Sequence, residues 1–170
     1  MKKLRFIALF VLLFLLGNTL CACSSAEKTP CREILTAMTD AEVGLPAGTV
    51  YDARADRDGD RFPSESLLGA LYGNGKMPPV SDSWLDCALF LSLSEHPCEF
   101  AVFLCNSHDA AVDTARLLCS RLDVIKTLKS NGEYGSMLDG ARVTVIKNYA
   151  LLIISSDSDN AERVAKKAVG

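Results

Sequence analysis

The sequence predicts an α+β fold, with a four-stranded antiparallel sheet formed by two ββα units and with helices ahead of the first unit. Two pairs of strand-like apolar runs are each joined by a short connection and followed by a segment with helical apolar spacing. The two strand-to-helix junctions also match, because residues 104–111 resemble residues 154–161 at a constant offset of 50. The six elements predicted in this way are 84–93, 100–106, 109–128, 142–147, 149–155 and 158–168.

Two helices and one strand are predicted ahead of these units. Thr29-Pro30 is typical of a helix start, and Gly44-Leu45-Pro46 ends the helix that follows. Residues 49–51 favour a short edge strand. Ser64 is a typical N-cap of a second helix, which stops at Gly73-Asn74-Gly75.

The helices of the two ββα units carry apolar stripes, and we expect both helices to pack on one face of the sheet. The first hairpin is apolar on both faces, which is unusual for an antiparallel sheet with one face in water. We assign Phe90, Ala101 and Phe103 to the second face. Phe90 and Phe103 are therefore candidate binding residues: they pack under the N-terminal helices, or they form an exposed patch that contacts a protein partner or a second copy of the chain.

The N-terminal segment has the form of a lipoprotein signal peptide. Basic residues within the first five positions precede an apolar run over 6–16, which is too short for the ~20 residues of a bilayer-spanning helix. Leu20, Ala22 and Cys23 then match a lipobox, with a small residue before the cut and a thiol after it. We expect Sec export, a diacylglyceryl group on Cys23 and residence on the outer face of the cell membrane. An ordinary secretory signal is the alternative.

The expected organisation is a signal peptide at 1–22, a lipidated cysteine with a short linker at 23–29, and one globular domain at 30–170. A net charge of −3 argues against a nucleic-acid partner. Loss of residues 1–22 removes three basic residues and no acidic ones, so the net charge becomes −6. We expect so acidic a domain to stand off from an anionic membrane and to contact it through the lipid alone.

Five cysteines follow Cys23, at positions 31, 87, 98, 105 and 119, and none of them forms a Cys-x-x-Cys pair. Four of these five lie in apolar segments, which favours buried free thiols. A single disulfide is the alternative, with Cys87 and Cys105 on neighbouring predicted strands as the pair.

An Asp-rich segment suggests a calcium loop through Asp56, Asp58 and Asp60. A calcium loop of the EF-hand type that begins at Asp56 needs Gly at its sixth position and Glu at its twelfth, but Arg61 and Leu67 are found there. Arginines inside the segment also supply countercharge. We therefore expect a solvated loop with local ion pairs and keep the metal site as the alternative.

The strand that begins at Glu99 resembles the Glu-x-Ala-Val-Phe strand of the domain-of-unknown-function 4358 family, small lipoproteins of Gram-positive bacteria. The resemblance covers roughly residues 71–168 together with the lipobox. It implies the fold and the location predicted above, but no reaction, since the family has no established activity. The matched residues are Glu99, Ala101, Val102, Phe103, Arg121, Tyr134, Tyr149, Leu151 and 155–159.

We predict no catalytic residue and no cofactor. The two histidines, His96 and His108, lie in turns, and His96 is too close to Cys98 along the chain to predict a converging catalytic site. The function expected from the sequence is a membrane-anchored, non-catalytic binding or interaction module. The alternatives are a thiol-active envelope enzyme and a metal-dependent one that uses the Asp-rich segment.

Overall fold

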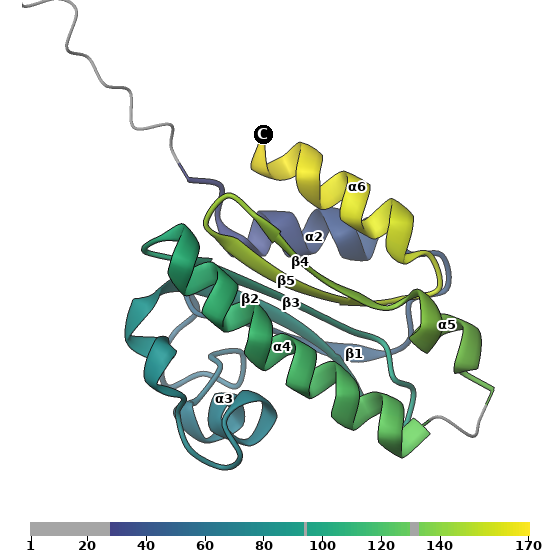
Figure 1. Cartoon of the computed structure of the whole chain (residues 1–170), viewed down its shortest axis with the longest axis horizontal. Helices are drawn as coiled ribbons and strands as arrows, with labels where there is room; N and C mark the ends of the chain where they lie inside the picture. The colour runs from purple at the N-terminus through teal and green to yellow at the C-terminus, as the bar shows by residue number, and fades with distance from the viewer. Residues whose placement is uncertain (1–27, 94, 130–132) are drawn as a thin grey trace, which may run out of the picture.

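Five antiparallel strands form a central sheet in the order β1-β2-β3-β5-β4 (Figure 1). The computed structural model describes residues 28–93, 95–129 and 133–170. The strands are β1 (Gly48–Asp52), β2 (Trp84–Ser92), β3 (Glu99–Cys105), β4 (Arg142–Ile146) and β5 (Tyr149–Ile154). The helices are α2 (Cys31–Ala41), α3 (Glu65–Tyr72), the 3-10 turn η1 (Pro79–Ser83), α4 (His108–Lys129), α5 (Gly135–Gly140) and α6 (Ser158–Val169).

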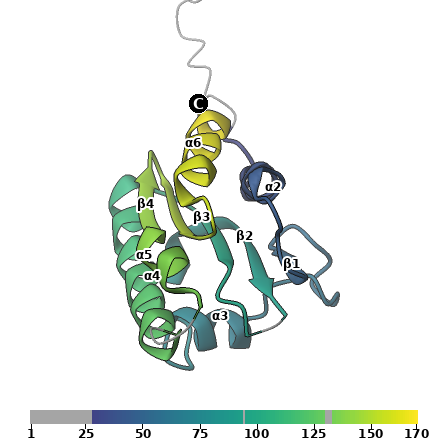
Figure 2. The ribbon, with the colours of Figure 1, turned by 90° about the vertical axis from the view of Figure 1, so that its right-hand side faces the viewer.

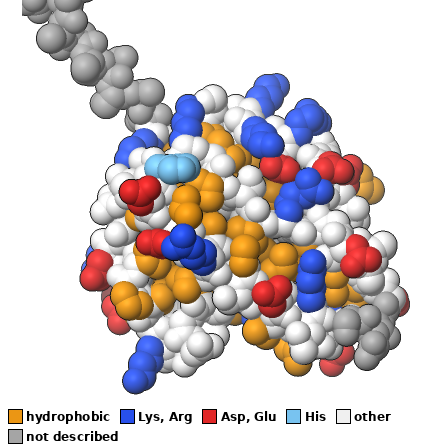
Figure 3. Space-filling model, in the orientation of Figure 1, with side chains coloured by type: hydrophobic (Ala, Val, Ile, Leu, Met, Phe, Trp, Pro, Cys, Tyr) orange, Lys and Arg blue, Asp and Glu red, His pale blue; other side chains and the backbone are white. Residues whose placement is uncertain are grey.

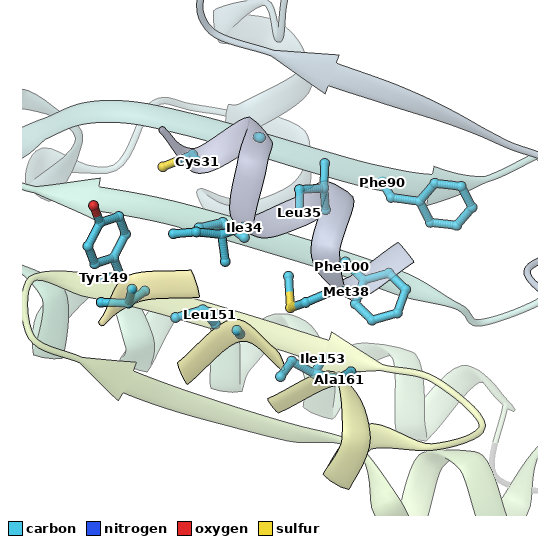
Figure 4. Packing of buried hydrophobic residues seen from close by; sticks show 14 of the residues in the cluster. Cys31, Ile34, Leu35, Met38, Phe90, Phe100, Tyr149, Leu151, Ile153 and Ala161 are labelled. Atoms are coloured by element: carbon cyan, nitrogen blue, oxygen red, sulfur yellow. The ribbon is translucent and has the colours of Figure 1, made fainter. Parts of the chain in front are cut away.

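Helices cover both faces of this sheet (Figure 2). On one face, Ile34 and Met38 of α2 pack with Phe100 and Ile153 of the strands, and α6 lies beside α2 (Figure 4). On the other face, α4 packs through Leu118 and neighbouring residues, together with α3 and α5. All residues of β3 and β5 are therefore buried, which explains why these strands are continuous apolar runs.

Side-chain caps fix where the helices begin. Ser64 Oγ accepts the N–H of Leu67 at 3.2 Å, as its position ahead of α3 predicted. Asp157 Oδ1 accepts the N–H of Asn160 at 3.0 Å at the start of α6. The start of α2 uses a distant cap instead, since the first N–H of the helix donates to buried Asp86 of β2 at 3.0 Å.

The predicted α+β class and antiparallel pairing are confirmed, but the predicted sheet is wrong in two respects. The sheet has five strands and not four, because the edge strand predicted at 49–51 is present as β1 and pairs with β2. In addition, α4 and α6 lie on opposite faces, because Ala111 of α4 and Ala161 of α6 belong to different core clusters. The physical reason is that both faces of the sheet must be covered. Two short helices, α2 and α6, share one face, while the 22-residue α4 spans the other.

Phe90 and Phe103 also lie on opposite faces, which corrects their assignment to one shared face. The register pairs Phe90 with Phe100 and Cys87 with Phe103, so Phe90 packs toward α2 and Phe103 toward α4. Their exposed fractions are 3% and 0%. Because side chains alternate along a strand, an error of one residue in register moves a side chain to the other face. Both residues are core residues, and they form no exposed patch.

Candidate functional site

The predicted site residues are scattered. Cys23 lies outside the described residues. In the described part of the chain, no helix is long and apolar enough to cross a bilayer. Phe90 and Phe103 belong to the two cores, and the aspartates of the Asp-rich segment lie at the surface between β1 and α3.

The Asp-rich segment forms an exposed loop, and its carboxylates accept hydrogen bonds that stabilise turns within the loop. Asp56 Oδ1 accepts the N–H of Asp58 at 3.2 Å, a local bond typical of turns. Arg54 pairs with the buried carboxylate of Asp86, with 3.1 Å between Nε and Oδ2. Among the described residues, no group of three or more His, Cys, Asp or Glu side chains is placed to hold a metal ion.

The five cysteines of the described chain are free thiols, and all except Cys119 are buried. Cys87 and Cys105, the pair considered for a disulfide, lie on neighbouring strands but are not cross-strand partners. Burial raises the pKa of Cys87 and of Cys98 to about 12, and it also raises the pKa of Cys105. These thiols therefore stay protonated at neutral pH, and a protonated thiol is a poor nucleophile.

His96 is half-buried in the β2–β3 connection, where the sequence predicted an exposed turn residue. Its Nδ1 accepts the N–H of Cys98 at 3.1 Å, and its ring packs against Tyr134 with 4.8 Å between centroids. The hydrogen bond to Cys98 involves the backbone amide and not the thiol. This arrangement is a turn that fixes the connection, and it does not activate the sulfur as a nucleophile.

A cavity of about 340 Å³ lies between this connection and the last turns of α4. Leu91, Ile125 and Leu128 supply apolar lining, and the Leu128 side chain is 73% exposed. Glu99 and Arg121 lie at the cavity as a buried ion pair, with 4% and 23% of their side chains exposed. One wall of the cavity is formed by α4, and the other by the β2–β3 connection with the strand ends on either side of it.

Side chains of two other elements surround the Glu99 carboxylate, Arg121 at the cavity and Tyr72 behind it. Arg121 Nη2 of α4 donates to Glu99 Oε2 of β3 at 2.7 Å, and Nε lies 3.2 and 3.3 Å from the two carboxylate oxygens. The Tyr72 hydroxyl of α3 donates to Glu99 Oε1 at 3.2 Å. Glu99 thus receives hydrogen bonds on both oxygens, which compensates the burial of its charge.

These groups hold their protons at neutral pH. Burial and the adjacent Glu99 carboxylate raise the pKa of Tyr72 well above its ordinary value. Burial opposes the charge on Arg121, but its hydrogen bonds to Glu99 outweigh that effect and raise the Arg121 pKa. Tyr72 is therefore a neutral donor and Arg121 a permanent cation, so neither is suited to proton transfer.

The Arg121 guanidinium still has N–H groups that can donate a hydrogen bond to a ligand. No hydrogen bond between described residues uses Nη1 of Arg121, which is a lining residue of the cavity. Because Nε and Nη2 are held by Glu99, the plane of the guanidinium is fixed before any ligand arrives. The arrangement suits recognition of a carbonyl or carboxylate oxygen next to an apolar group.

One sequence signal points to this site independently of the family resemblance that includes Glu99 and Arg121. A carboxylate at the start of an apolar strand must find a cation or hydrogen-bond donors if it is buried. The partner lies 22 residues further along the chain, and helical spacing alone does not select it among the basic residues of α4.

Comparison of the chain with models of protein families, with curated proteins and with solved structures found no match. The resemblance to the domain-of-unknown-function 4358 family stays a prediction.

Proposed function

We propose that the protein is a membrane-anchored extracytoplasmic lipoprotein whose domain is a non-catalytic binding module. The anchor is supported by Leu20, Ala22 and Cys23, which follow a short apolar run behind a basic start. The family resemblance supports the same location. The binding role is supported by the cavity at Arg121.

The observation that carries the binding role is a guanidinium fixed by Glu99 beside an apolar wall. A ligand with an aliphatic group and a carboxylate would place the aliphatic group on Ile125 and Leu128 and an oxygen on Arg121. A short peptide with a free carboxylate has this chemistry. Thiol chemistry is not favoured, because burial keeps the thiols of Cys87 and Cys98 protonated.

The binding role is tested by NMR titration of the chain with N-acetyl-leucine, and with N-acetyl-leucine amide as the uncharged comparison. The carboxylate is expected to shift the backbone amide signals of Leu91, His96 and Cys98 and of residues 121–129, and the amide compound to shift them less. Leu128→Ser should weaken binding, whereas Val124→Ser, on the same helix and outside the cavity lining, should not. Equal shifts with both compounds, or equal binding by both variants, would contradict the assignment.

The anchor is tested by mass spectrometry of the chain extracted from its own membrane. The expected N-terminal residue is Cys23 with a diacylglyceryl group, and Cys23→Ala should release the domain from the membrane fraction. An unmodified terminus, or a Cys23→Ala variant processed and retained as before, would contradict the anchor.

A further inference from the structure

One end of the domain gathers exposed basic side chains from three parts of the chain. This surface, the basic end, consists of Lys28 ahead of α2, Arg32 in the first turn of α2, Lys147 in the β4–β5 turn and Lys167 in the last turn of α6. Figure 3 shows blue side chains along the top of the molecule, over α6 and close to the C-terminus.

Hydrogen bonds join these three parts into one surface. Thr29 Oγ1 donates to the carbonyl of Ala168 at 2.9 Å, which ties the start of α2 to the end of α6. The Tyr149 hydroxyl donates to the carbonyl of Thr29 at 2.8 Å. Lys147 Nζ lies 3.4 Å from the carbonyl oxygen of Val169. The backbone segments that carry the basic side chains are therefore held side by side at one end of the domain.

The cations of the basic end are not paired with carboxylates of the described residues, although Lys147 contacts the Val169 carbonyl. Lys28, Arg32, Lys147 and Lys167 take part in no salt bridge between described residues, whereas Lys166, their neighbour on α6, pairs with Glu162 at 2.7 Å. Two exposed carboxylates, Glu33 and Asp109, lie in the first turns of α2 and α4. The four cations outnumber these two carboxylates, and they exceed them by one when Glu27, which precedes Lys28 in the sequence, is also counted, so this end is positive although the domain as a whole is acidic.

The basic end also contains a pocket of about 270 Å³. Lys28 and Lys147 line it together with Asn148 and Tyr149, while Leu104 and Val169 contribute apolar surface. Ammonium and amide donors around a small pocket suit a phosphate oxygen, and the apolar residues suit the adjoining carbon atoms of a headgroup.

We propose that the basic end binds the phosphate groups of an anionic lipid surface and orients the domain on its membrane. The orientation rests on the proposed anchor: five residues lead from Cys23 to Lys28, and a chain of that length spans at most about 18 Å. The basic end is thus the part of the domain nearest to the bilayer. Its cations can approach the anionic headgroups to within the Debye length of about 8 Å, the distance over which the headgroups attract them. The domain docks on the membrane through this end. Its net negative charge, which includes the Asp-rich segment, does not prevent this contact with the anionic surface.

Lysine footprinting tests the proposal on the chain extracted from its own membrane. The chain is reconstituted into vesicles of phosphatidylcholine alone or with phosphatidylglycerol, acetylated with a water-soluble reagent and mapped by mass spectrometry. Lys28, Lys147 and Lys167 should react at least about five-fold more slowly on the anionic vesicles, the effect of one basic side chain at such a surface. High salt should remove this protection, and Lys76, beyond α3, should react equally on both.

The Lys147→Gln/Lys167→Gln variant should lose the protection of Lys28, whereas Lys76→Gln should keep it. Equal labelling of the basic end on both vesicle types would overturn the proposal. Protection by inorganic phosphate alone would assign the pocket to a soluble anion and would also overturn it. The same spectra report the state of Cys23. A lipidated Cys23 with no protection contradicts only this inference, whereas protection with an unmodified Cys23 contradicts only the anchor.

Discussion

Glu99 and Arg121 form an ion pair whose role is positional. Their charges cost free energy to remove from water, and the hydrogen bonds between them and from Tyr72 offset that cost. A buried pair of this kind adds little stability over an apolar pair of the same size, but the loss of one partner leaves the other charge uncompensated. The pair fixes the orientation of the Arg121 guanidinium at the cavity wall.

Glu99→Gln should lower the free energy of unfolding by about 3 kcal/mol, because Arg121 then lies in a largely buried site without a countercharge. Urea denaturation measures this change. Arg116→Ala is the matched control, since it breaks the exposed Arg116–Asp113 pair of the same helix and should cost at most about 1 kcal/mol. Equal losses in the two variants would show that burial does not distinguish the pairs.

Thiol labelling should separate Cys119 from the other cysteines of the described domain. Cys119 is exposed, whereas Cys31, Cys87, Cys98 and Cys105 are buried. A maleimide at neutral pH, followed by peptide mapping, should modify Cys119 rapidly and the four buried thiols only in denaturant. A Cys87–Cys105 disulfide would instead leave both of these unmodified in denaturant until a reductant is added.

The buried thiols should also make the domain less stable in alkali. Burial raises the pKa of Cys87 and Cys98 from 9.0 to about 12, so both stay protonated in the folded state while they ionise in the unfolded chain. Their stabilising contribution is complete below pH 9 and is lost as the pH rises toward 12. Each thiol should cost about 1.4 kcal/mol per pH unit in this window. Urea midpoints at pH 8 and pH 10.5 measure the loss, and Cys98→Ala should reduce it.

The helices and strands themselves could be predicted, because their signals are local. Apolar spacing marked α4 and α6, and Thr29-Pro30 and Ser64 marked the starts of α2 and α3. The short α5 was missed because its six residues, of which the first and the last are glycines, carry no helical period. The faces on which α4 and α6 lie could not be predicted, since a capped turn after a strand starts a helix toward either face.

The sheet register places Phe90 and Phe103 among different neighbours, although both side chains are buried. Phe90→Ala and Phe103→Ala should each lower the free energy of unfolding by about 3–5 kcal/mol, with no change in oligomeric state. Leu85→Ala, at a side chain that is 57% exposed on the same strand as Phe90, should have little effect. Denaturation and size-exclusion chromatography measure the two properties. A stable variant with altered association would restore the interface interpretation.

At the scale of the whole molecule, the two helical layers depend on one sheet. Every residue of β3 and β5 is buried, and side chains of each strand alternate between the cluster under α2 and α6 and the cluster under α4. The sequence predicted the fold class, since that follows from the order of elements. Cover of the second face by the N-terminal helices was one of two alternatives, and α2 lies there, but neither the place of α6 on that face nor the cavity at Arg121 was predicted, because both depend on contacts between distant segments.

Because both helical layers pack on the same sheet, we expect a substitution that destabilises one layer to lower the stability of the other layer equally. Trp84 is the single tryptophan of the chain and reports on the α4 side, where it packs on Phe103 with 4.5 Å between ring centroids and donates to Thr114 at 2.8 Å. Met38 is fully buried on the opposite side, under α2. Met38→Ala should cost about 2–5 kcal/mol and should lower the urea midpoint of Trp84 fluorescence as much as that of helical circular dichroism.

Thr36→Ala, on the exposed side of α2, is the control and should leave both midpoints nearly unchanged. The layers would be independent if Met38→Ala lowered the circular dichroism midpoint while Trp84 fluorescence kept its original one. Coincident midpoints are expected, because loss of α2 exposes one side of β3 and β5, and the same two strands form the floor on which α4 and Trp84 pack.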